Sequence, residues 1–571
     1  MNKRRLIRVA SGKEKADLVL KNVNLINTLS GEIYITDVAV CDGYIAGIVP
    51  GYKGIIEKDC KGKYLSPGFI DGHVHIESSM VSPSEFAKAI VPRGTTTVIA
   101  DPHEIANVKG LKGIDYILSF VDKIPLNIFI MLPSCVPSTN LETSGAVLSA
   151  EKLSKYHDNP NVLGLGEFMN YPGVINTCDD VMDKLEMFHD KIIDGHAPMV
   201  TGMNLCAYRA AGVTSEHECT TVEEALEKLR MGMYIMIREG SATKNLLDLM
   251  PLLNKFNERF CFFSTDDRHP DDLIQEGHID NMVKMLVIEQ GNIVRAVRLA
   301  SKNAAEYFGL KELGSIAPGY KADMLVIEDF SKMIIKEVYK DGKLVAQNGK
   351  AIFENIDIVD ESVFSSINTI IEPEKIKIKV NNKSIINVIE IIPSQIITKR
   401  IKVKPLIKNK YAQSDVENDI LKFCVFERHN GTGNIGTGFV KGLGLKKGAI
   451  GTSVSHDSHN INVIGTNDKD IIKCAEIIKE NNGGQAVVCD GKVLDVLPLP
   501  IAGLMSLWSL EKVSEKIKSL HSICKELGVS LKDPFITMAF LALPVIPDIK
   551  LTDKGLVDVT KFKFIDLVEE L

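Results

Sequence analysis

The sequence lacks the features that mark several large classes of protein. Its longest apolar stretch, residues 535–546, is interrupted by Pro544 and is shorter than the roughly 20 residues of a membrane span. It has no CxxC pair, and its 11 cysteines are scattered. Too few apolar residues follow the basic residues 1–8 for a secretory signal. These absences exclude a zinc knuckle and a disulfide-stapled fold, and they predict a cytoplasmic protein without a membrane partner.

An excess of positive charge is also missing. The 67 Lys and Arg residues are balanced by 74 Asp and Glu, which gives a net charge of −7 and a pI near 6.1. A general attraction to nucleic acid is therefore not expected. What the chain does have is a globular composition, with 45% hydrophobic and 25% charged residues. At about 100–200 residues per domain, its length predicts several domains, each with its own core.

Apolar patterning divides the chain into four segments. Short β-rich runs separated by Ser-Gly and Asp-Gly turns occupy residues 16–49 and return at residues 322–346. We interpret residues 1–62 and 311–368 as two parts of one small β-sandwich, built from both flanks of a central domain. Residues 369–571 mix strands and helices, which predicts a C-terminal α+β domain.

The central segment, residues 63–310, alternates short apolar runs with segments of helical length, as βα units do. Eight strands are predicted, at residues 68–75, 95–101, 127–132, 162–167, 191–196, 212–217, 233–238 and 260–266. Eight strands in about 250 residues are typical of a closed (β/α)8 TIM-like barrel, whose active site lies at the C-terminal ends of the strands. The sequence therefore predicts an α/β protein with its site at that edge.

Two features of the C-terminal segment have simple structural interpretations. Lysine alternates with Ile or Val at residues 375–380 and 399–404, which predicts strands with one solvated face. Residues 431–436 match GxGxxG, but the sequence that follows is rich in glycine and β-like. Because a dinucleotide fingerprint must open a helix, we expect structural turns there.

Residues that can bind metal ions stand at the ends of the predicted barrel strands. His73 and His75 are two residues apart, so in a strand they point the same way. Later strands end at Glu167, His196, His217 and Asp266. Histidines without a shared role have no reason to keep this spacing. Four imidazoles and two carboxylates suffice for two divalent ions, so the pattern predicts a binuclear metal centre.

A binuclear centre of this kind activates water, because the metals lower its pKa and generate hydroxide at neutral pH. Asp266 can be a metal ligand and an acid/base at once, taking the proton of the hydroxide and passing it to a ring nitrogen or leaving group. This division of labour describes hydrolysis of a C–N bond.

The residues that enter the first strand, Pro-Gly-Phe-Ile-Asp-Gly-His-Val-His at 67–75, resemble those of the amidohydrolase superfamily. So do the later ligands and the split flanking sheet, over about residues 16–350. The resemblance implies a metal-dependent hydrolase on a distorted TIM barrel. Hydantoinase-like and dihydroorotase-like members carry a carboxylated lysine on the fourth strand, where this chain has Glu167. That difference argues against them.

More specific motifs resemble the bacterial adenine deaminase family over essentially the whole chain. They are DGHVHIESSM at 71–80, DPHEIANV at 101–108, GEFMN at 166–170, DGHAP at 194–198, REGS at 238–241, FSTDD at 263–267 and SHDSHN at 455–460. The resemblance implies conversion of adenine and water to hypoxanthine and ammonia in purine salvage. It also implies a binuclear centre of manganese or iron, with zinc as a further option, and a homo-oligomer.

The resemblance further implies roles for the ligands. Glu167 would bridge the two ions, with His73 and His75 on one ion and His196 and His217 on the other. A hydroxide between the metals would attack C6 of adenine, and Asp266 would act as acid/base.

Further acidic residues near the same edge are candidates for catalysis or substrate binding. Glu77 lies on the same strand face as His75, so it could contact the purine, shuttle a proton or orient a histidine. Glu104 follows the second strand and Glu239 follows the seventh, where either could bind substrate. Beside Glu104, His103 could ligate a further ion or cap the loop.

His456, Asp457 and His459 form a polar cluster between apolar strands of the C-terminal segment. They could bind another metal ion, cover the active site, or form a hydrogen-bonded turn.

Two alternatives to adenine deamination remain open. The first is hydrolysis of a cyclic amide or N-acyl group on the same binuclear barrel. The second is a non-catalytic assembly protein that retains the barrel, although such a protein should have lost ligands and all six are present.

Overall fold

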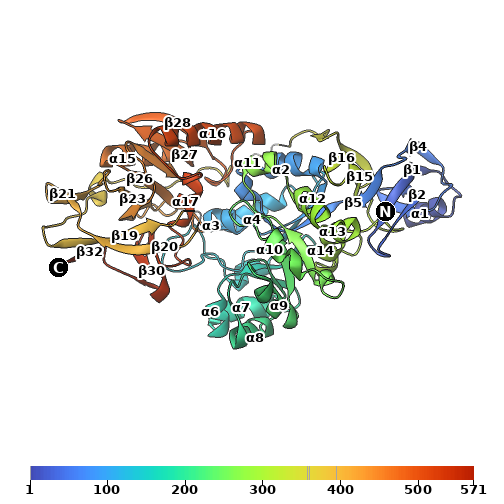
Figure 1. Cartoon of the computed structure of the whole chain (residues 1–571), viewed down its shortest axis with the longest axis horizontal. Helices are drawn as coiled ribbons and strands as arrows, with labels where there is room; N and C mark the ends of the chain where they lie inside the picture. The colour runs from blue at the N-terminus through green and yellow to red at the C-terminus, as the bar shows by residue number, and fades with distance from the viewer. Residues whose placement is uncertain (1, 357, 359, 394, 571) are drawn as a thin grey trace.

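The computed structural model describes residues 2–356, 358, 360–393 and 395–570. These residues form an elongated molecule, with a small N-terminal sheet at one end, a barrel in the middle and the C-terminal domain at the other end (Figure 1). Within this part of the chain, no helix has the length and apolar character needed to cross a lipid bilayer.

The N-terminal sheet is built from two distant segments. The first segment contributes α1 (Lys3–Ala10), β1 (Ala16–Asn27), β2 (Glu32–Cys41), β3 (Tyr44–Gly47), β4 (Gly54–Asp59) and β5 (Tyr64–Pro67). The second contributes β15 (Met324–Asp329), β16 (Ile334–Lys340), β17 (Lys343–Gln347) and β18 (Lys350–Ala351). Antiparallel pairing of β5 with β15 joins both segments in one nine-stranded sheet. Leu65 and Met324 share its apolar core, so both flanks contribute to the packing of the sheet.

Eight parallel strands form the barrel. They are β6 (Phe69–His75), β7 (Thr95–Ala100), β8 (Asn127–Leu132), β9 (Val162–Phe168), β10 (Ile192–Gly195), β11 (Ser215–Glu216), β12 (Tyr234–Arg238) and β13 (Cys261–Ser264), which continues past Thr265 as β14 (Asp266–Asp267). The pairing of β14 with β6 links the last strand to the first. Each predicted strand is present, which confirms the TIM-like barrel.

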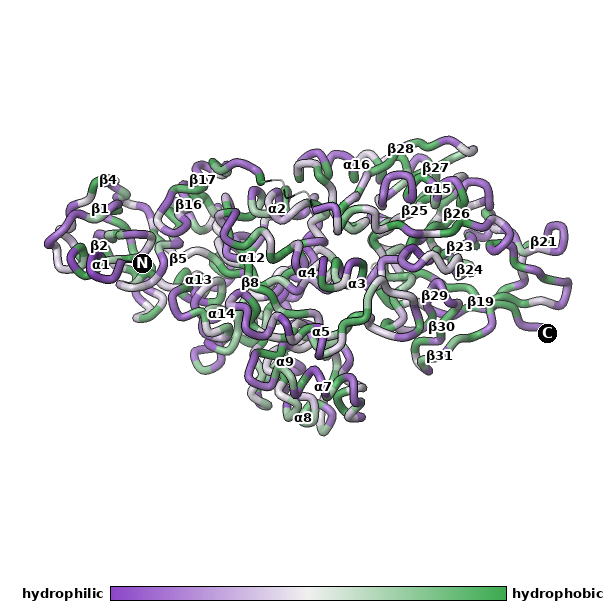
Figure 2. Tube along the Cα trace, turned by 180° about the vertical axis from the view of Figure 1, so that it is seen from behind, coloured by the Kyte–Doolittle hydropathy of each residue, from purple (hydrophilic) through white to green (hydrophobic). Residues whose placement is uncertain are grey.

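Helices surround these strands and bury their outer faces. They are α2 (Pro83–Ile90), α3 (His103–Lys109), α4 (Leu111–Leu118), α5 (Ala150–Ser154), α6 (Tyr171–Ile175), α7 (Asp179–Met187), α8 (Gly202–Ala210), α9 (Val222–Arg230), α10 (Leu246–Leu249), α11 (Pro270–Gln275), α12 (Ile279–Gln290), α13 (Ile293–Leu299) and α14 (Lys302–Tyr307). Hydrophilic and hydrophobic positions alternate along the outer helices (Figure 2), because one face of each helix packs on the core.

The C-terminal domain is centred on a second nine-stranded sheet. Its strands are β19 (Ser384–Ile391), β20 (Thr398–Val403), β23 (Ile420–Phe426), β24 (Ile435–Lys441), β25 (Ala449–Thr452), β26 (Ile461–Gly465), β27 (Gly484–Cys489), β28 (Lys492–Pro498) and β32 (Val568–Glu570). Smaller sheets contain β21 (Leu406–Lys408) with β22 (Tyr411–Gln413), and β29 (Ile549–Thr552) with β30 (Gly555–Asp558) and β31 (Lys563–Phe564). The helices are α15 (Asp468–Glu480), α16 (Leu510–Glu526) and α17 (Pro534–Phe540).

The two lysine-rich strand predictions have different outcomes. Residues 399–404 largely coincide with β20, whereas residues 375 and 376 belong to a 3₁₀ turn, Pro373–Ile376, and Lys379 after it forms only an isolated antiparallel bridge with Tyr411. Proline fits the first turn of a helix, and Lys375 pairs with Glu372 three residues away, a spacing that suits a helical turn. The expectation for residues 431–436 is confirmed, because the strand β24 follows them instead of a helix.

The C-terminal domain docks onto the mouth of the barrel through backbone and side-chain hydrogen bonds. The amide of Ser506 donates to the carbonyl of Met80 at 2.8 Å. The amide and hydroxyl of Thr143 both donate to the carboxylate of Asp553, at 2.8 and 2.7 Å. Asn460 donates from Nδ2 to the carbonyl of Thr143 at 2.9 Å. This edge of the barrel is therefore closed by a second domain.

We expect Gly164→Ala to destabilise the barrel. A Cβ at Gly164 in β9 would overlap the carbonyl oxygen of Ile192 in β10, so the two strands would have to separate. Overpacking of this kind costs about 1–3 kcal/mol. Thermal unfolding should show a lower midpoint for this variant. The matched control is Gly438→Ala in β24, where a Cβ makes only ordinary contacts with Leu551; an equal loss in both variants would contradict the explanation.

Candidate active site

All six predicted ligands reach the same mouth of the barrel. Parallel strands in a closed barrel share one direction, so their C-terminal ends gather at one edge. The residues are His73 and His75 in β6, Glu167 in β9, His196 after β10, His217 after β11 and Asp266 in β14. The structure therefore brings together residues that lie up to 193 positions apart (266 − 73 = 193).

Glu167 lies at the centre of this group. Its Oε1 is 3.3 Å from Nε2 of His75, and its Oε2 is 2.6 Å from Nδ1 of His196 and 3.3 Å from Nε2 of His217. His103, a candidate outside the six, also points at it, with Nδ1 3.3 Å from Oε1. Both carboxylate oxygens are thus shared among imidazoles, the arrangement needed for a carboxylate that bridges two ions.

Asp266 completes the group from β14, several strands away from Glu167 around the barrel. Its Oδ1 lies 3.2 Å from Nε2 of His75 and 3.9 Å from Nε2 of His73. Its backbone has φ = 56°, a left-handed conformation that most L-residues avoid and that Asp tolerates. Asp71 holds this turn, because Thr265 donates to it from its amide at 3.0 Å and from its hydroxyl at 2.5 Å.

Several imidazole nitrogens in this group are available to bind a cation. Nδ1 of His75 donates to the carbonyl of Asp101 at 2.9 Å, which leaves the lone pair of Nε2 facing both carboxylates. In the part of the chain that the structure describes, Nε2 of His73 and both ring nitrogens of His217 have no hydrogen-bond partner. Burial, together with His217 and His75, lowers the pKa of His73 well below its usual value, so this ring is neutral.

The arrangement of these atoms fits divalent metal ions. His73, His75 and Asp266 present ligand atoms within 4.8 Å of one another, and so do His73, Glu167 and His217. A neutral His73 ring, and ring nitrogens without hydrogen-bond partners beside buried carboxylates, fit the donor set of a metal site and are costly without a cation. We conclude that the mouth of the barrel is built to hold divalent metal.

Two residues at the centre were missed in the sequence analysis. Nη1 of Arg238 donates to Oδ2 of Asp266 at 2.5 Å, and its Nη2 donates to Oε2 of Glu218 at 2.9 Å. Oε1 of Glu218 is 3.6 Å from Nε2 of His217. Burial acts to raise the pKa of Asp266, but Arg238 and His75 outweigh it and hold that pKa well below its usual value. Arg238 ends the seventh strand, so its position alone could have identified it.

The C-terminal domain reaches this centre through Glu104. Nδ1 of His456 is 2.8 Å from Oε1 of Glu104, and Nε2 of His459 contacts Oε2. These three groups are close enough for a metal ion. However, the amide of Ser455 donates to Nδ1 of His459 at 3.0 Å, so the neutral ring carries its proton on Nε2, the nitrogen that contacts Glu104. The contacts therefore fit a carboxylate held by two histidines rather than a metal site.

The charges of these two histidines differ. Burial acts to lower the pKa of His456, but the charge of Glu104 outweighs it and raises that pKa to about 9. Burial lowers the pKa of His459, which agrees with a neutral ring. Asp457, between them, is buried, and its Oδ2 has no hydrogen-bond partner among the described residues. The cluster is thus an ion pair with Glu104, supported by a neutral donor.

Glu77 and Glu239 have different surroundings. Glu77 lies in the 3₁₀ turn Ile76–Ser79 after β6; its Oε1 accepts from the amide of Ile105 at 3.1 Å, whereas its Oε2 has no partner within the described residues. Oε2 of Glu239 accepts from the amide of Leu246 at 3.2 Å. Glu77 and Glu104 both line a narrow cavity between the barrel and the C-terminal domain, whereas Glu239 does not.

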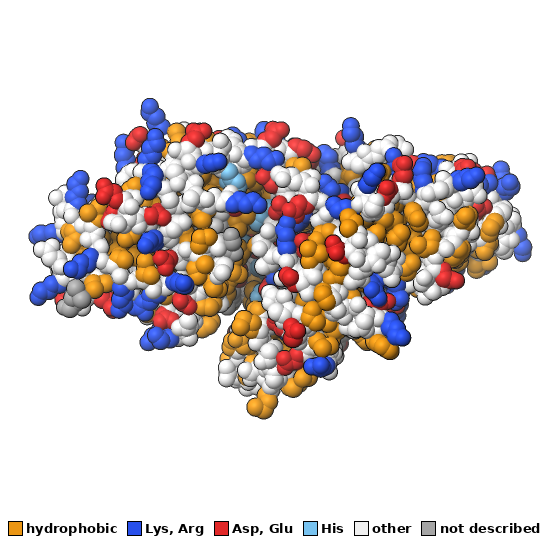
Figure 3. Space-filling model, viewed as in Figure 1, with side chains coloured by type: hydrophobic (Ala, Val, Ile, Leu, Met, Phe, Trp, Pro, Cys, Tyr) orange, Lys and Arg blue, Asp and Glu red, His pale blue; other side chains and the backbone are white. Residues whose placement is uncertain are grey.

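A narrow cavity of about 20 Å³ lies between the barrel and the C-terminal domain. Among its lining residues are Glu77, Glu104, His456 and Gln485. It shares several lining residues, Gln485 included, with an adjoining cavity of about 520 Å³. Figure 3 shows histidine atoms in the hollow between the C-terminal domain and the barrel. Together the two cavities lead to Glu77 and Glu104, and none of the six predicted ligands lines either of them.

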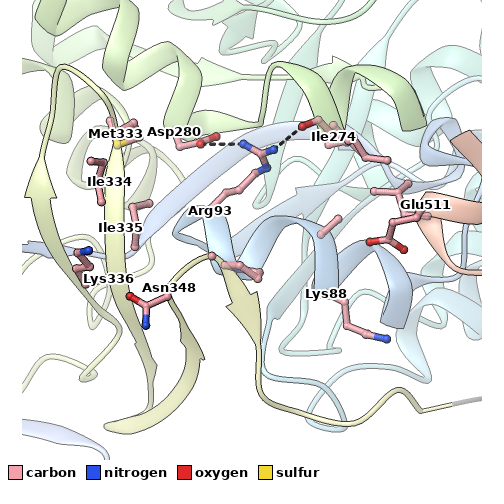
Figure 4. A pocket seen from close by; sticks show the side chains of 15 residues that line it. Lys88, Arg93, Ile274, Asp280, Met333, Ile334, Ile335, Lys336, Asn348 and Glu511 are labelled. Atoms are coloured by element: carbon pink, nitrogen blue, oxygen red, sulfur yellow. Dashed lines mark hydrogen bonds and ion pairs between the residues drawn. The ribbon is translucent and has the colours of Figure 1, made fainter.

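Another cavity of about 520 Å³ lies far from these ligands, beside α2 and β16 (Figure 4). Its main cation is already engaged, because Arg93 donates to the carbonyl of Ile274 at 2.7 Å and to Asp280 at 3.3 Å. Lys88 likewise pairs with Glu85. Both of these cations are therefore already neutralised by neighbouring groups.

Comparison with known proteins gives matches along nearly the whole chain. Residues 64–345 match the model of the amidohydrolase family, and residues 395–563 match that of the adenine deaminase C-terminal domain. Adenine deaminase 2 of Carboxydothermus hydrogenoformans is 54% identical over 562 residues, covering 98% of each chain. Adenine deaminase of Desulfatibacillum aliphaticivorans is 47% identical over 566 residues, covering 99% of each. A solved β-aspartyl dipeptidase of Fervidobacterium islandicum AW-1 aligns with 60% of this chain and 99% of its own, at 18% identity and a TM-score of 0.46.

We expect Glu167→Gln to lose divalent metal. The amide keeps the shape of the side chain but removes the negative charge that four imidazoles face. Removing a group that merely orients a metal ligand costs about 10–100-fold in affinity, so loss of a ligand itself should cost at least about 100-fold. Metal per chain, measured by mass spectrometry after dialysis, checks this. The control is the exposed Glu289→Gln, and metal retention by Glu167→Gln equal to that of the control would contradict the assignment.

Proposed function

Because this chain belongs to the adenine deaminase family of the amidohydrolases, we propose that it converts adenine and water to hypoxanthine and ammonia. The observation that carries the proposal is the convergence of four imidazoles on Glu167 and Asp266, beside a cavity that the adenine deaminase C-terminal domain closes. Glu104 lines this cavity and adjoins His103, and Nδ1 of His103 lies 3.3 Å from Glu167, so the cavity leads toward the ligand group.

Two divalent ions complete the centre in this proposal. Glu167 would be shared between them, His73 and His75 would hold one ion, and His196 and His217 would hold the other, with Asp266 as a further ligand. When bound, the ions polarise the substrate and lower the pKa of water. Manganese or iron suits a set of imidazole and carboxylate donors without thiolate, and zinc is the alternative. The partnerless nitrogens of His73 and His217 support this assignment.

Asp266 moves the protons. The oxygen of water forms a bond to C6 of adenine, and Asp266 takes one proton from that water and passes it to N1. It then carries the second proton to the amino nitrogen, so the C6–N bond breaks and ammonia leaves. The product keeps the oxygen on C6 and the proton on N1, which is hypoxanthine. Arg238 holds Asp266 ionised and pointing into the mouth before the reaction begins.

Glu77 and Glu104 bind and orient the purine. Oε2 of Glu77 has no hydrogen-bond partner within the described residues and lines the narrow cavity, so it can meet a ring nitrogen or the amino group. His456 and His459 fix Glu104 on the other side of this cavity. Two carboxyl groups thus define the plane in which a flat heterocycle fits.

We place the enzyme in the cytoplasm, in purine salvage, as a homo-oligomer that acts on adenine and binds neither nucleic acid nor membrane. All 11 cysteines are free, which suits a reducing compartment. Met199 and Met203 are 83% and 89% exposed, and large apolar side chains that stand this far out suit a surface covered by another subunit. The net charge of −7 supports the absence of a nucleic-acid partner.

The substrate is tested by incubating the manganese-loaded protein with adenine, adenosine and a panel of cyclic amides. We expect ammonia and hypoxanthine from adenine in equal amounts, and none in a chelated control, measured by chromatography with an ammonia assay. Hydrolysis of a cyclic amide without action on adenine would overturn the proposed substrate and leave the barrel assignment standing.

We expect Asp266→Asn to keep most of its metal and lose turnover. The amide retains the size and one ligand oxygen of the side chain but cannot accept the proton of water. Loss of a general acid/base typically costs about 10²–10⁴-fold in rate. Metal content and kcat on adenine are measured on the same preparation. Substantial kcat in this variant would remove Asp266 from the acid/base role.

A further inference from the structure

Gln485 is a buried polar residue that the mechanism above does not use. It lies in β27 of the C-terminal domain, is 3% exposed, and lines both the narrow cavity and the larger one beside it. Its Oε1 has no hydrogen-bond partner among the described residues. Leaving a buried amide oxygen unpaired costs about 1–3 kcal/mol, so its position is explained when a bound molecule supplies a donor.

The position of Gln485 in the cavity indicates which part of the substrate it meets. Glu104 and His456 line only the narrow cavity, and Glu104 adjoins His103, which faces Glu167. This end of the cavity is therefore the end nearest the metal ligands. Gln485 also lines the larger cavity, so it stands at the outer end, away from the reacting atoms.

The chemistry of adenine matches this position. C6 must face the metal ligands for the reaction to occur. The edge of the ring system farthest from C6 carries N3, a hydrogen-bond acceptor, beside N9–H, a donor. A glutamine amide carries a donor and an acceptor side by side, so it pairs with such an edge through two hydrogen bonds. The imidazole groups at the inner end do not offer this pair, because the donor and acceptor nitrogens of a neutral ring point in different directions.

We propose that Gln485 is the residue that recognises the free base, accepting a hydrogen bond from N9–H at Oε1 and donating one from Nε2 to N3. This inference rests on the proposed function, since it assumes that adenine binds with C6 toward the ligands. A nucleoside carries a sugar on N9 and has no N9–H, so Gln485 rejects it both by leaving Oε1 unpaired and by contact with the substituent. The C-terminal domain thereby selects a base over its nucleoside.

The test compares three variants on three molecules. The variants are Gln485→Ala, the isosteric Gln485→Glu, and the control Gln413→Ala, which changes a glutamine of the same domain that bonds to the carbonyl of Ala412. Adenine is the substrate, and 3-deazaadenine and 9-methyladenine, which lack N3 and N9–H respectively, are inhibitors. Metal content and the unfolding midpoint show that each variant is folded.

We expect Gln485→Ala to lower kcat/KM for adenine about tenfold or more, mostly through KM. Loss of an amide that makes two hydrogen bonds to a base lowers affinity by a factor of about this size. The Ki values of 3-deazaadenine and 9-methyladenine should change less, since each has already lost one of the two bonds. Gln485→Glu places a carboxylate oxygen against N3, so this variant should shift preference toward 3-deazaadenine. Gln413→Ala should behave as wild type.

Either of two results in an active wild type would overturn the inference while the proposed function stands. One is kcat/KM for adenine unchanged within about twofold in Gln485→Ala. The other is an equal loss of affinity for adenine and both analogues. That result would mean that Gln485 shapes the cavity but does not form hydrogen bonds with N3 and N9–H. If the metal-loaded wild type releases no ammonia from adenine, the proposed function itself fails and this inference fails with it.

Discussion

The burial of two carboxylates among imidazoles is the constraint on which the rest of the structure depends. Glu167 is within 3.3 Å of nitrogens from His75, His103, His196 and His217. Taking a carboxylate out of water costs several kcal/mol unless it is paired. The barrel offsets this cost by bringing ligands from five strands to one edge, where imidazoles surround the carboxylates. Divalent metal would neutralise the remaining negative charge. The neutral ring of His73 and the ring nitrogens without hydrogen-bond partners follow from the same requirement.

The C-terminal domain is part of the site as well as a neighbour of it. His456 and His459 hold Glu104, and Gln485 lines the cavity above it. Backbone and side-chain hydrogen bonds at Met80 and Thr143 fix the domain against the barrel mouth. A metal centre on the barrel supplies reactivity that many hydrolases share, whereas the second domain supplies the groups that distinguish one heterocycle from another. We propose that the barrel supplies the chemistry and that both domains contribute to substrate binding.

The sequence predicted the barrel and its ligand group because both depend on local pattern. A residue at the end of a barrel strand must lie at the mouth, so spacing alone brings His73 and Asp266 together. Contacts between distant segments have no such local pattern. His456 contacts Glu104, which lies 352 positions away in the sequence. Gln485 lines the cavity only because the C-terminal domain docks onto the barrel. The strand predicted at residues 375–380 is reduced to a bridge at Lys379, because Pro373 begins a 3₁₀ turn that extends to Ile376.

The most direct test of this account is a titration of metal-free protein with Mn²⁺ while the rate of ammonia release from adenine is measured. If Glu167 bridges two ions, the rate should rise until two equivalents per chain are bound and then remain constant, and the unfolding midpoint should rise with it. Full activity at one equivalent, or activity that persists in the chelated protein, would contradict the binuclear centre on which the account rests.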